Sequence, residues 1–451
     1  METNTKVLPI KHDKEASCRQ FFWPMMAIFY ALFVIRDVFS VEFPVSIYLI
    51  WVAVMAFAFN DTEIKALIIS FIPLAPGFQS KYAALVCMIF LLIKYHKKLR
   101  VPMFLFLLPS LMFWELLHMG DGFSTIPEYL AGFAPLLCLA VVVSLPKKQE
   151  DISFFTRVLA ITLTVSILVL IANMVFGSHG SLVSLIQEGF RLGNIEEAEN
   201  YQISYNVNEL GFMCNIAIAG LLSNIYFKSA RKSDYVLVAF LILIGCLTVS
   251  RAFLLCLAGT IVLYVILQKT TFTHKVKVFA FALLLILASF IILEMVAPSI
   301  IDNYVARFSV DDITSGRTYL LEFYNDFITS SFERFFYGIG VQNIKQKMWY
   351  LEGVKVNVPH NGYQQMIVAW GVVGLLLMIL FIIYLVLHAR KQNPRLQFMC
   401  YLPLFLLLIN IMAGQFVTSG TKLFSLMFIY LMICNGGTHT RLGECDVVEE
   451  Y

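Results

Sequence analysis

The segment VPHNGYQQMIVAWGVVGLLLMI, residues 358–379, begins as polar chain and continues as an apolar run. Its histidine, His360, stands between a proline and an asparagine just before that run. Because an imidazole titrates near neutral pH, a histidine at this place can serve as a general base. Asn361 can orient the ring or a substrate hydroxyl. Alternatively, Asn361 caps a helix that starts here, and His360 then has no chemical role.

Two arginines stand where apolar runs meet polar chain. Arg251, in TVSRAFLLC, is close enough to hydrocarbon to need a partner, which is either an anionic ligand or lipid headgroups. Arg317 lies in SGRTYLLEFYNDFI, and a preceding polar residue (Asp312, Thr314 or Ser315) can cap a helix that has Arg317 in its first turn. A cation at a positive helix end becomes favourable when an anion binds there. The alternative is an ion pair with a neighbouring aspartate.

A third arginine and two pairs of glycines complete the candidates. Arg191, in EGFRLGN, is surrounded by glutamates, so it either forms a surface ion pair or grips a substrate. Gly338 and Gly340, in FFYGIGVQN, indicate a tight turn or a close approach of the backbone to a ligand. Gly371 and Gly374 allow close packing of helices. The sequence has no DxD pair, HExxH motif or P-loop, so we expect neither a metal nor a cofactor.

The composition predicts that membrane spans position these residues. Of the 451 residues, 59% are hydrophobic and 14% are charged, whereas about 25% are charged in soluble proteins. The small net charge of +3 gives no indication of nucleic-acid binding. Apolar runs long enough to cross a bilayer recur along the chain. We predict an all-α, polytopic integral membrane protein with about 14 transmembrane helices, at 21–40, 43–60, 63–77, 81–95, 101–119, 126–145, 152–176, 206–227, 233–249, 251–268, 276–296, 363–389, 397–415 and 421–435.

The distribution of basic residues predicts the orientation. If the N-terminus is cytoplasmic, most of the 33 lysines and arginines fall on the cytoplasmic side. We therefore predict a cytoplasmic tail at 1–20, a single transmembrane domain at 21–435 and a cytoplasmic tail at 436–451. The long loops at 178–205 and 297–362 are then periplasmic, and the second is expected to contain short helices. The candidate residues all lie on this outer side.

The order of these segments resembles the successive motifs of the O-antigen ligase and Wzy-type polymerase superfamily. The motifs are RLGN…NVNELGF, SRAFLL, SGRTYLLEFYNDFI, FYGIGVQN and PHNGYQQMIVAWGVVGLL, over roughly residues 190–390. By this likeness His360 matches the loop histidine of the family, and Arg251 and Arg317 match its pyrophosphate-facing arginines.

Two further matches are less regular. Arg191 resembles a loop arginine of the polymerases that varies in position. Asn208 matches an asparagine that opens the span after the first loop, although Asn206 and Val207 precede it here, where a proline often stands. The resemblance places Arg191 and Asn208, together with Asn361, Gly338 and Gly340, among the expected substrate-binding residues.

The resemblance implies a metal-independent glycosyltransferase with a GT-C-like fold in the bacterial inner membrane. Its donor is a glycan carried on undecaprenyl pyrophosphate, and its active site faces the periplasm. His360 takes the acceptor proton, and Arg251 and Arg317 neutralise the departing pyrophosphate. Expected partners are the lipid-linked oligosaccharide, membrane lipid and a chain-length regulator protein; we expect no nucleic acid.

Three activities remain open at this stage. We expect an O-antigen polymerase, because 14 spans and the charged 178–205 loop are more typical of that branch. A ligase, which transfers the glycan to lipid A-core, is the alternative. A lipid-linked oligosaccharide flippase is a third interpretation. It is disfavoured because the sequence shows neither repeated halves nor charges at the middle of the membrane, and because its outer loop is long.

Overall fold

The computed structural model is all-helical over the residues that it describes, which are 12–42, 44–75, 79–118, 125–148, 150–178, 192, 205–268, 270–296, 298–308, 317–344, 358–393, 396–412 and 414–436. Five helices in these ranges are long and apolar enough to cross a membrane, and shorter apolar helices accompany them. The structure therefore confirms that the described chain is all-helical, and the length and apolarity of these helices are consistent with a multi-pass membrane protein. The number of 14 spans stays a prediction.

Each of the 14 predicted spans coincides with a helix. The elements run α1 (His12–Asp37), α2 (Ser46–Ala58), α3 (Asp61–Leu74), α4 (Ser80–Tyr95), η1 (His96–Lys98), η2 (Met103–Phe106), α5 (Leu107–Leu116), α6 (Ile126–Ser144), α7 (Ile152–Ser178), α9 (Val207–Tyr226), α10 (Lys232–Leu247), α11 (Arg251–Leu267), α12 (Phe272–Val296), α13 (Pro298–Phe308), α14 (Arg317–Thr329), α15 (Phe332–Tyr337), α17 (Gly362–Gln392), η4 (Phe398–Tyr401), α18 (Leu402–Met412) and α19 (Gly420–Asn435).

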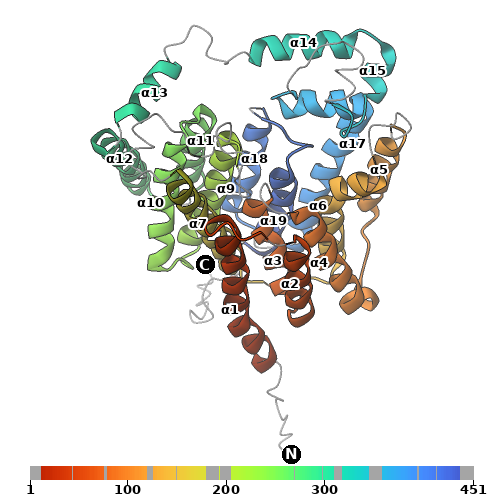
Figure 1. Ribbon diagram of the computed structural model, residues 1–451, viewed down its shortest axis with the longest axis horizontal. Helices are drawn as coiled ribbons and strands as arrows, with labels where there is room; N and C mark the ends of the chain where they lie inside the picture. The colour runs from red at the N-terminus through yellow and green to blue at the C-terminus, as the bar shows by residue number, and fades with distance from the viewer. Residues whose placement is uncertain are drawn as a thin grey trace, which may run out of the picture.

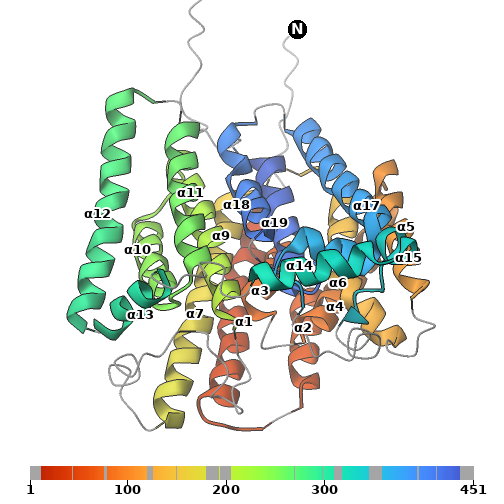
Figure 2. The ribbon, with the colours of Figure 1, turned by 90° about the horizontal axis from the view of Figure 1, so that it is seen from above.

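Three of these helices form the centre of the bundle. In α19 every residue from Thr421 to Asn435 is buried, and α3 and α9 are almost as enclosed. These helices carry polar residues such as Lys65, Asn215 and Lys422, which are buried in the protein interior because they are unfavourable against lipid. In contrast, α12 stands at the edge (Figures 1 and 2) and exposes Phe281, Leu284 and Ile291. Such a surface is suited to lipid.

Short helices cover one side of the bundle, as expected for the long second loop. We call the face on which α9, α11 and α17 begin the outer face, and the face on which α3, α7 and α10 begin the inner face, following the predicted orientation. α13 is attached to the end of α10, because the Tyr304 hydroxyl donates to the Cys246 carbonyl over 2.8 Å. α14 and α15 lie against α17. The N-terminal end of α14 points toward the side of α9 and α11 (Figures 1 and 2).

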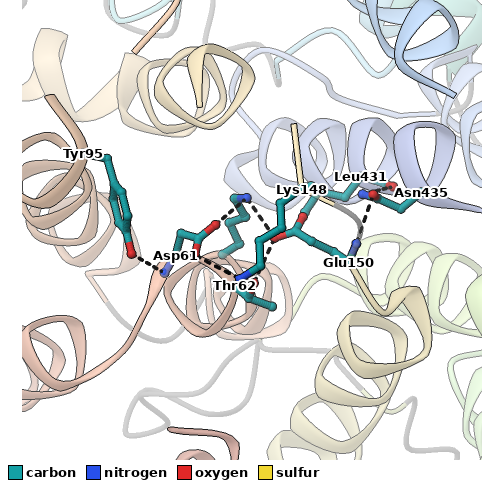
Figure 3. Close-up of polar contacts among 8 residues, drawn as sticks. Asp61, Thr62, Tyr95, Lys148, Glu150, Leu431 and Asn435 are labelled. Carbon is teal, nitrogen blue, oxygen red and sulfur yellow. Dashed lines mark hydrogen bonds and ion pairs between the residues drawn. The ribbon is translucent and has the colours of Figure 1, made fainter. Parts of the chain in front are cut away.

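A buried polar network joins helices at the inner face (Figure 3). Lys65 of α3 donates to Glu150 over 2.9 Å and lies 3.5 Å from Asp61. Glu150 also accepts from the Thr62 hydroxyl over 3.1 Å, and its backbone N–H donates to Asn435 at the end of α19. A buried charge is tolerated only when it is paired and hydrogen-bonded. The network therefore fixes the inner ends of α3 and α19 and the turn before α7.

Candidate functional site

His360 and Asn361 stand at the start of α17. The Asn361 side-chain oxygen accepts hydrogen bonds from the backbone N–H groups of Tyr363 and Gln364 over 3.0 and 3.2 Å. This is the N-cap arrangement that asparagine favours. Half-buried His360 directly precedes the cap. The helix-capping interpretation of Asn361 is thus confirmed, whereas the roles of both residues toward a substrate stay predictions.

Gln364 connects the start of α17 to α14. Its side-chain amide donates to the Leu321 carbonyl over 2.7 Å and to the Asn325 side chain over 2.9 Å. Arg317 is the first residue of α14 and lies about one turn before Leu321. The prediction that Arg317 lies in a first helical turn is therefore confirmed. The residues predicted to cap this helix, 312–315, lie outside the described residues.

A tyrosine of α14 is a second titratable group near this junction. Tyr324 is next to Asn325 in the chain and is only 1% exposed. Burial raises the pKa of the Tyr324 phenol further above its ordinary value, so this side chain stays protonated at neutral pH. The role of His360 as a base stays a prediction.

Ser250, the residue before Arg251, contacts Asn208, although 42 positions separate the two in the sequence. Arg251 is the first residue of α11, whose N-cap Ser250 accepts from the Phe253 N–H over 3.3 Å. The same Ser250 hydroxyl donates to the Asn208 side-chain oxygen over 2.8 Å. Asn208 is in the first turn of α9, which Asn206 caps. The starts of α9 and α11 are therefore joined, with half-buried Arg251 at the junction.

Arg191 lies outside the described residues, but its neighbour Leu192 is described. Leu192 is buried, and its N–H donates to the Leu247 carbonyl at the end of α10 over 3.1 Å. Leu247 precedes Arg251 by four residues. The residue after Arg191 is therefore anchored on the Arg251 side of the bundle.

Lys422 is a buried cation that the sequence interpretation missed. Lys422 lies in the first turn of α19 and is only 3% exposed. The ammonium lies 5.7 Å from the ring centre of Phe212, one turn beyond Asn208 on α9. It also contacts the Asn410 carbonyl near the end of α18 over 3.4 Å. Lys422 therefore links the start of α19 to both α9 and α18.

The segment between α18 and α19 contacts the first turn of α17. The Gln365 side chain accepts from the N–H groups of Phe416 and Val417 over 2.8 and 3.0 Å and donates to the Thr418 hydroxyl over 2.8 Å. A Cβ atom on Gly362 would lie 2.8 Å from Phe416, so this approach is very close. Through α18 and α19, the His360 end of α17 is thereby connected to the Asn208–Arg251 junction.

The GIG segment makes a close backbone contact with α17, whereas the sequence indicated a tight turn or an approach to a ligand. Gly338 and Gly340 have φ angles of +73° and +85°, which favour glycine. The N–H groups of Ile339 and Gly340 donate to the carbonyls of Val368 and Ala369 over 2.9 and 2.8 Å. A Cβ atom on Gly338 would lie 2.5 Å from the Ala369 oxygen. Both glycines thus serve contact with α17, and their proposed contact with a substrate stays a prediction.

Gly371, from the second pair of glycines, makes a close helix contact as expected and in addition interrupts its own helix. Gly371 has φ +65° and ψ −172°, so it breaks α17 instead of continuing it. A Cβ atom there would lie 2.1 Å from the Phe336 carbonyl oxygen. The close contact is therefore between the break and the backbone of α15. The predicted span 363–389 consists of two helical segments joined at Gly371.

Glu115 of α5 holds the GIG segment and the break together. This carboxylate is 2% exposed, and its two oxygens accept from the Val341 N–H over 3.0 Å. One of them also accepts from the Trp370 indole over 2.7 Å. The neighbouring Trp114 indole donates to the Trp370 carbonyl over 2.9 Å. The sequence interpretation missed Glu115, although a lone carboxylate in an apolar run already indicates a buried partner.

Residues 236–379 match the family described as O-antigen ligase. The matched segment runs from α10 to the middle of α17 and includes Arg251, Arg317 and His360, whereas Arg191 and Asn208 precede it. The match confirms the resemblance to the O-antigen ligase and polymerase superfamily, whose members are glycosyltransferase-like enzymes of membranes that act on lipid-linked glycans. No curated protein matches the chain significantly.

Proposed function

We propose that this protein is a surface-polysaccharide polymerase with a GT-C-like fold in the bacterial inner membrane. It joins repeat units carried on undecaprenyl pyrophosphate, and its site opens to the periplasm. A chain-length regulator is its expected protein partner. The family match supports glycosyl transfer from a lipid-linked glycan. The choice of polymerase rests on the predicted 14 spans and on the charged loop at 178–205.

The observation that carries the proposal is that the candidate residues stand at helix starts. Arg251 and Asn208 are in the first turns of α11 and α9, Arg317 begins α14, and His360 precedes α17. Helix N-termini carry positive partial charge and exposed N–H groups, and arginine binds phosphate with two parallel hydrogen bonds. This combination is suited to a pyrophosphate group.

The proposed reaction needs one base and a stabilised leaving group. His360 removes the proton from the acceptor hydroxyl while that oxygen forms a bond to the anomeric carbon of the donor. The bond from this carbon to the pyrophosphate oxygen breaks, and the electron pair leaves with undecaprenyl pyrophosphate. Arg251 and Arg317 neutralise the charge that develops there, which is electrostatic stabilisation of the transition state. Asn208 orients Arg251 indirectly, because it accepts a hydrogen bond from the hydroxyl of the preceding Ser250.

A ligase is the second candidate, because the matching family is described by that activity. The two reactions share a donor and differ in the acceptor. A polymerase uses a second lipid-linked repeat, whereas a ligase uses lipid A-core. The same base and arginines serve both reactions.

The lipopolysaccharide of a strain that lacks this protein separates the candidates. Loss of a polymerase leaves core carrying one repeat unit, and this is the expected result. Bare core with polymerised glycan on the carrier indicates a ligase. Bare core with single carrier-linked repeats trapped on the cytoplasmic side indicates a flippase and contradicts the proposal. Complementation with the intact gene is the control.

A further inference from the structure

A cavity of about 320 Å³ opens at the inner face, between α1, α7 and α10. α7 contacts both of the other helices and stands between them (Figures 1 and 2). The cavity lies at the helix ends opposite to those that carry Arg251 and His360. Its size is at the lower end of the range for small-molecule sites, roughly 300–1,000 Å³. The proposed glycosyl transfer makes no use of it.

Arg157 of α7 forms a fixed wall of this cavity. Its guanidinium donates two hydrogen bonds to Asp234, each of 3.1 Å, one to the Ser229 carbonyl over 2.7 Å and one to the Ser153 hydroxyl over 3.1 Å. A bidentate pair of this kind fixes the plane of the guanidinium. Asp234 balances the charge of Arg157, so the wall is rigid and close to neutral.

The other two arginines leave the cavity with excess positive charge. Arg19 lies 3.6 Å from Asp151 and over the ring of Phe154, with its side chain 45% exposed. Exposed Arg231 stands at the N-cap position of α10, where its backbone N–H donates to Asp234 over 3.0 Å. Among Asp151, Asp234 and the three arginines, the arginines are in excess by one charge. The N-terminal ends of α7 and α10 add positive partial charge at the same place.

Apart from Ser233, the remaining lining is apolar or aromatic. Trp23 lies one turn after Arg19 on α1, and Phe154 and Ile161 lie on the face of α7 that also carries Arg157. Tryptophan is the residue typical of the boundary between headgroups and hydrocarbon. The cavity therefore combines a cationic end with an apolar wall. This combination is suited to a ligand that has a negatively charged headgroup and an apolar chain.

We propose that this cavity binds an anionic phospholipid of the inner leaflet through its phosphate headgroup. The phosphodiester of phosphatidylglycerol carries one negative charge, which matches the excess of the three arginines over Asp151 and Asp234. Arg19 and Arg231 bind the phosphate oxygens, and the glycerol and upper acyl chain lie against Trp23 and Phe154. Basic pockets between helices on the cytoplasmic side are suited to such headgroups. The proposal does not depend on the glycosyltransferase assignment.

The first test measures binding of phosphatidylglycerol to the purified full chain. Titration in detergent, followed by native mass spectrometry, should show tighter binding of phosphatidylglycerol than of phosphatidylcholine. Arg19→Gln with Arg231→Gln should weaken the phosphatidylglycerol affinity about 30-fold, which corresponds to about 1 kcal/mol for each cation. Lys97→Gln with Lys277→Gln removes the same charge from exposed positions elsewhere and should leave the affinity unchanged. Equal weakening by both pairs would overturn the proposal.

The second test separates a lipid from free phosphate and reports the place of binding. Phosphatidylglycerol with brominated chains should quench tryptophan fluorescence more than brominated phosphatidylcholine does. This difference should disappear in Trp23→Phe and persist in Trp51→Phe. Inorganic phosphate at equal ionic strength should not displace the lipid. Displacement by phosphate alone, or a difference that persists without Trp23, would contradict a lipid site here.

Discussion

The Ser250 hydroxyl donates a hydrogen bond of 2.8 Å to the Asn208 side-chain oxygen, and so joins the first turns of α11 and α9. The same hydroxyl caps α11 by accepting from the Phe253 N–H. One serine therefore performs two tasks beside Arg251. Because Arg251 begins the capped helix, its position depends on α9 as well as on α11.

Removal of this hydroxyl should affect activity more than stability. Ser250→Ala loses the cap, which costs about 1 kcal/mol, and it also releases Asn208 beside Arg251. We expect a small decrease in the melting temperature of the purified protein and at least a tenfold decrease in transfer rate. Ser331→Ala removes an equivalent cap from α15 and is the matched control. Equal rates in the two variants would show that the Ser250–Asn208 contact has no role in transfer.

The two arginines should be needed for transfer and not for folding. Arg251→Ala and Arg317→Ala should each decrease the rate about 10²- to 10³-fold, the usual loss when a donor to a developing negative charge is removed. Lysine should restore only part of the rate because it lacks the planar fork of arginine. The measurement is chain extension by variants that reach the membrane at normal levels. Arg334→Ala, on α15, is the control and should stay active; full activity in both test variants would remove the pyrophosphate role.

Glu115 should be essential for stability. Glu115→Ala leaves the Val341 N–H and the Trp370 indole buried without their acceptor, at a cost of about 1.5–3 kcal/mol for each hydrogen bond to a charged group. Glu115→Gln keeps one acceptor oxygen and should be intermediate. Thermal unfolding in detergent tests this order. Glu128→Ala changes an exposed carboxylate of α6 and should have the smaller effect.

Gly371→Ala should also destabilise the protein. The combination of positive φ with ψ near 180° is almost restricted to glycine and costs about 1–3 kcal/mol for other residues, and a Cβ atom there would collide with the Phe336 carbonyl. Gly259→Ala is the matched control, because its Cβ would meet Ile409 at an ordinary 3.7 Å. The control should be as stable as the unaltered protein. A stable, active Gly371→Ala variant would show that the break in α17 is dispensable.

Length and hydropathy predicted the helices because each run needs only to be apolar and long. The break at Gly371 escaped prediction, since the residues around it are as apolar as those of a continuous span. A glycine in a span usually indicates close packing, and only the neighbouring α15 backbone shows why this one bends the chain. The helix starts at Arg317 and Asn361 were predictable because capping residues act locally.

The relationships between distant residues were not predictable in the same way. Nothing in the sequence near Asn208 indicates that Ser250 is its partner, and nothing near Glu115 indicates Trp370. Both pairs depend on how helices pack, which a single sequence does not encode locally. Lys422 was overlooked because a lysine near the end of a span usually extends to the interface. Its burial between α9 and α18 required the fold.

His360 provides the sharpest test of the mechanism. A general base contributes about 10²- to 10⁴-fold in rate. His360→Ala should therefore nearly abolish transfer in a purified assay with undecaprenyl-pyrophosphate-linked repeats, and His360→Gln should be almost as inactive because an amide cannot accept the proton. His274→Gln, on the inner side, should stay active. The rate of the unaltered enzyme should fall as acidification protonates the imidazole.

The structure already assigns Asn361 the task of capping α17, so a cap alone does not require His360. If His360 only supports that cap, glutamine should be tolerated, and alanine should cost about 1 kcal/mol of stability or less without loss of transfer. Asn361→Ala then becomes the informative comparison, because it removes the cap and leaves the imidazole. We expect it to lower the melting temperature more than His360→Gln does and to decrease transfer less. A fully active His360→Gln enzyme would reject the general base and leave Arg251 and Arg317 as the proposed catalytic residues.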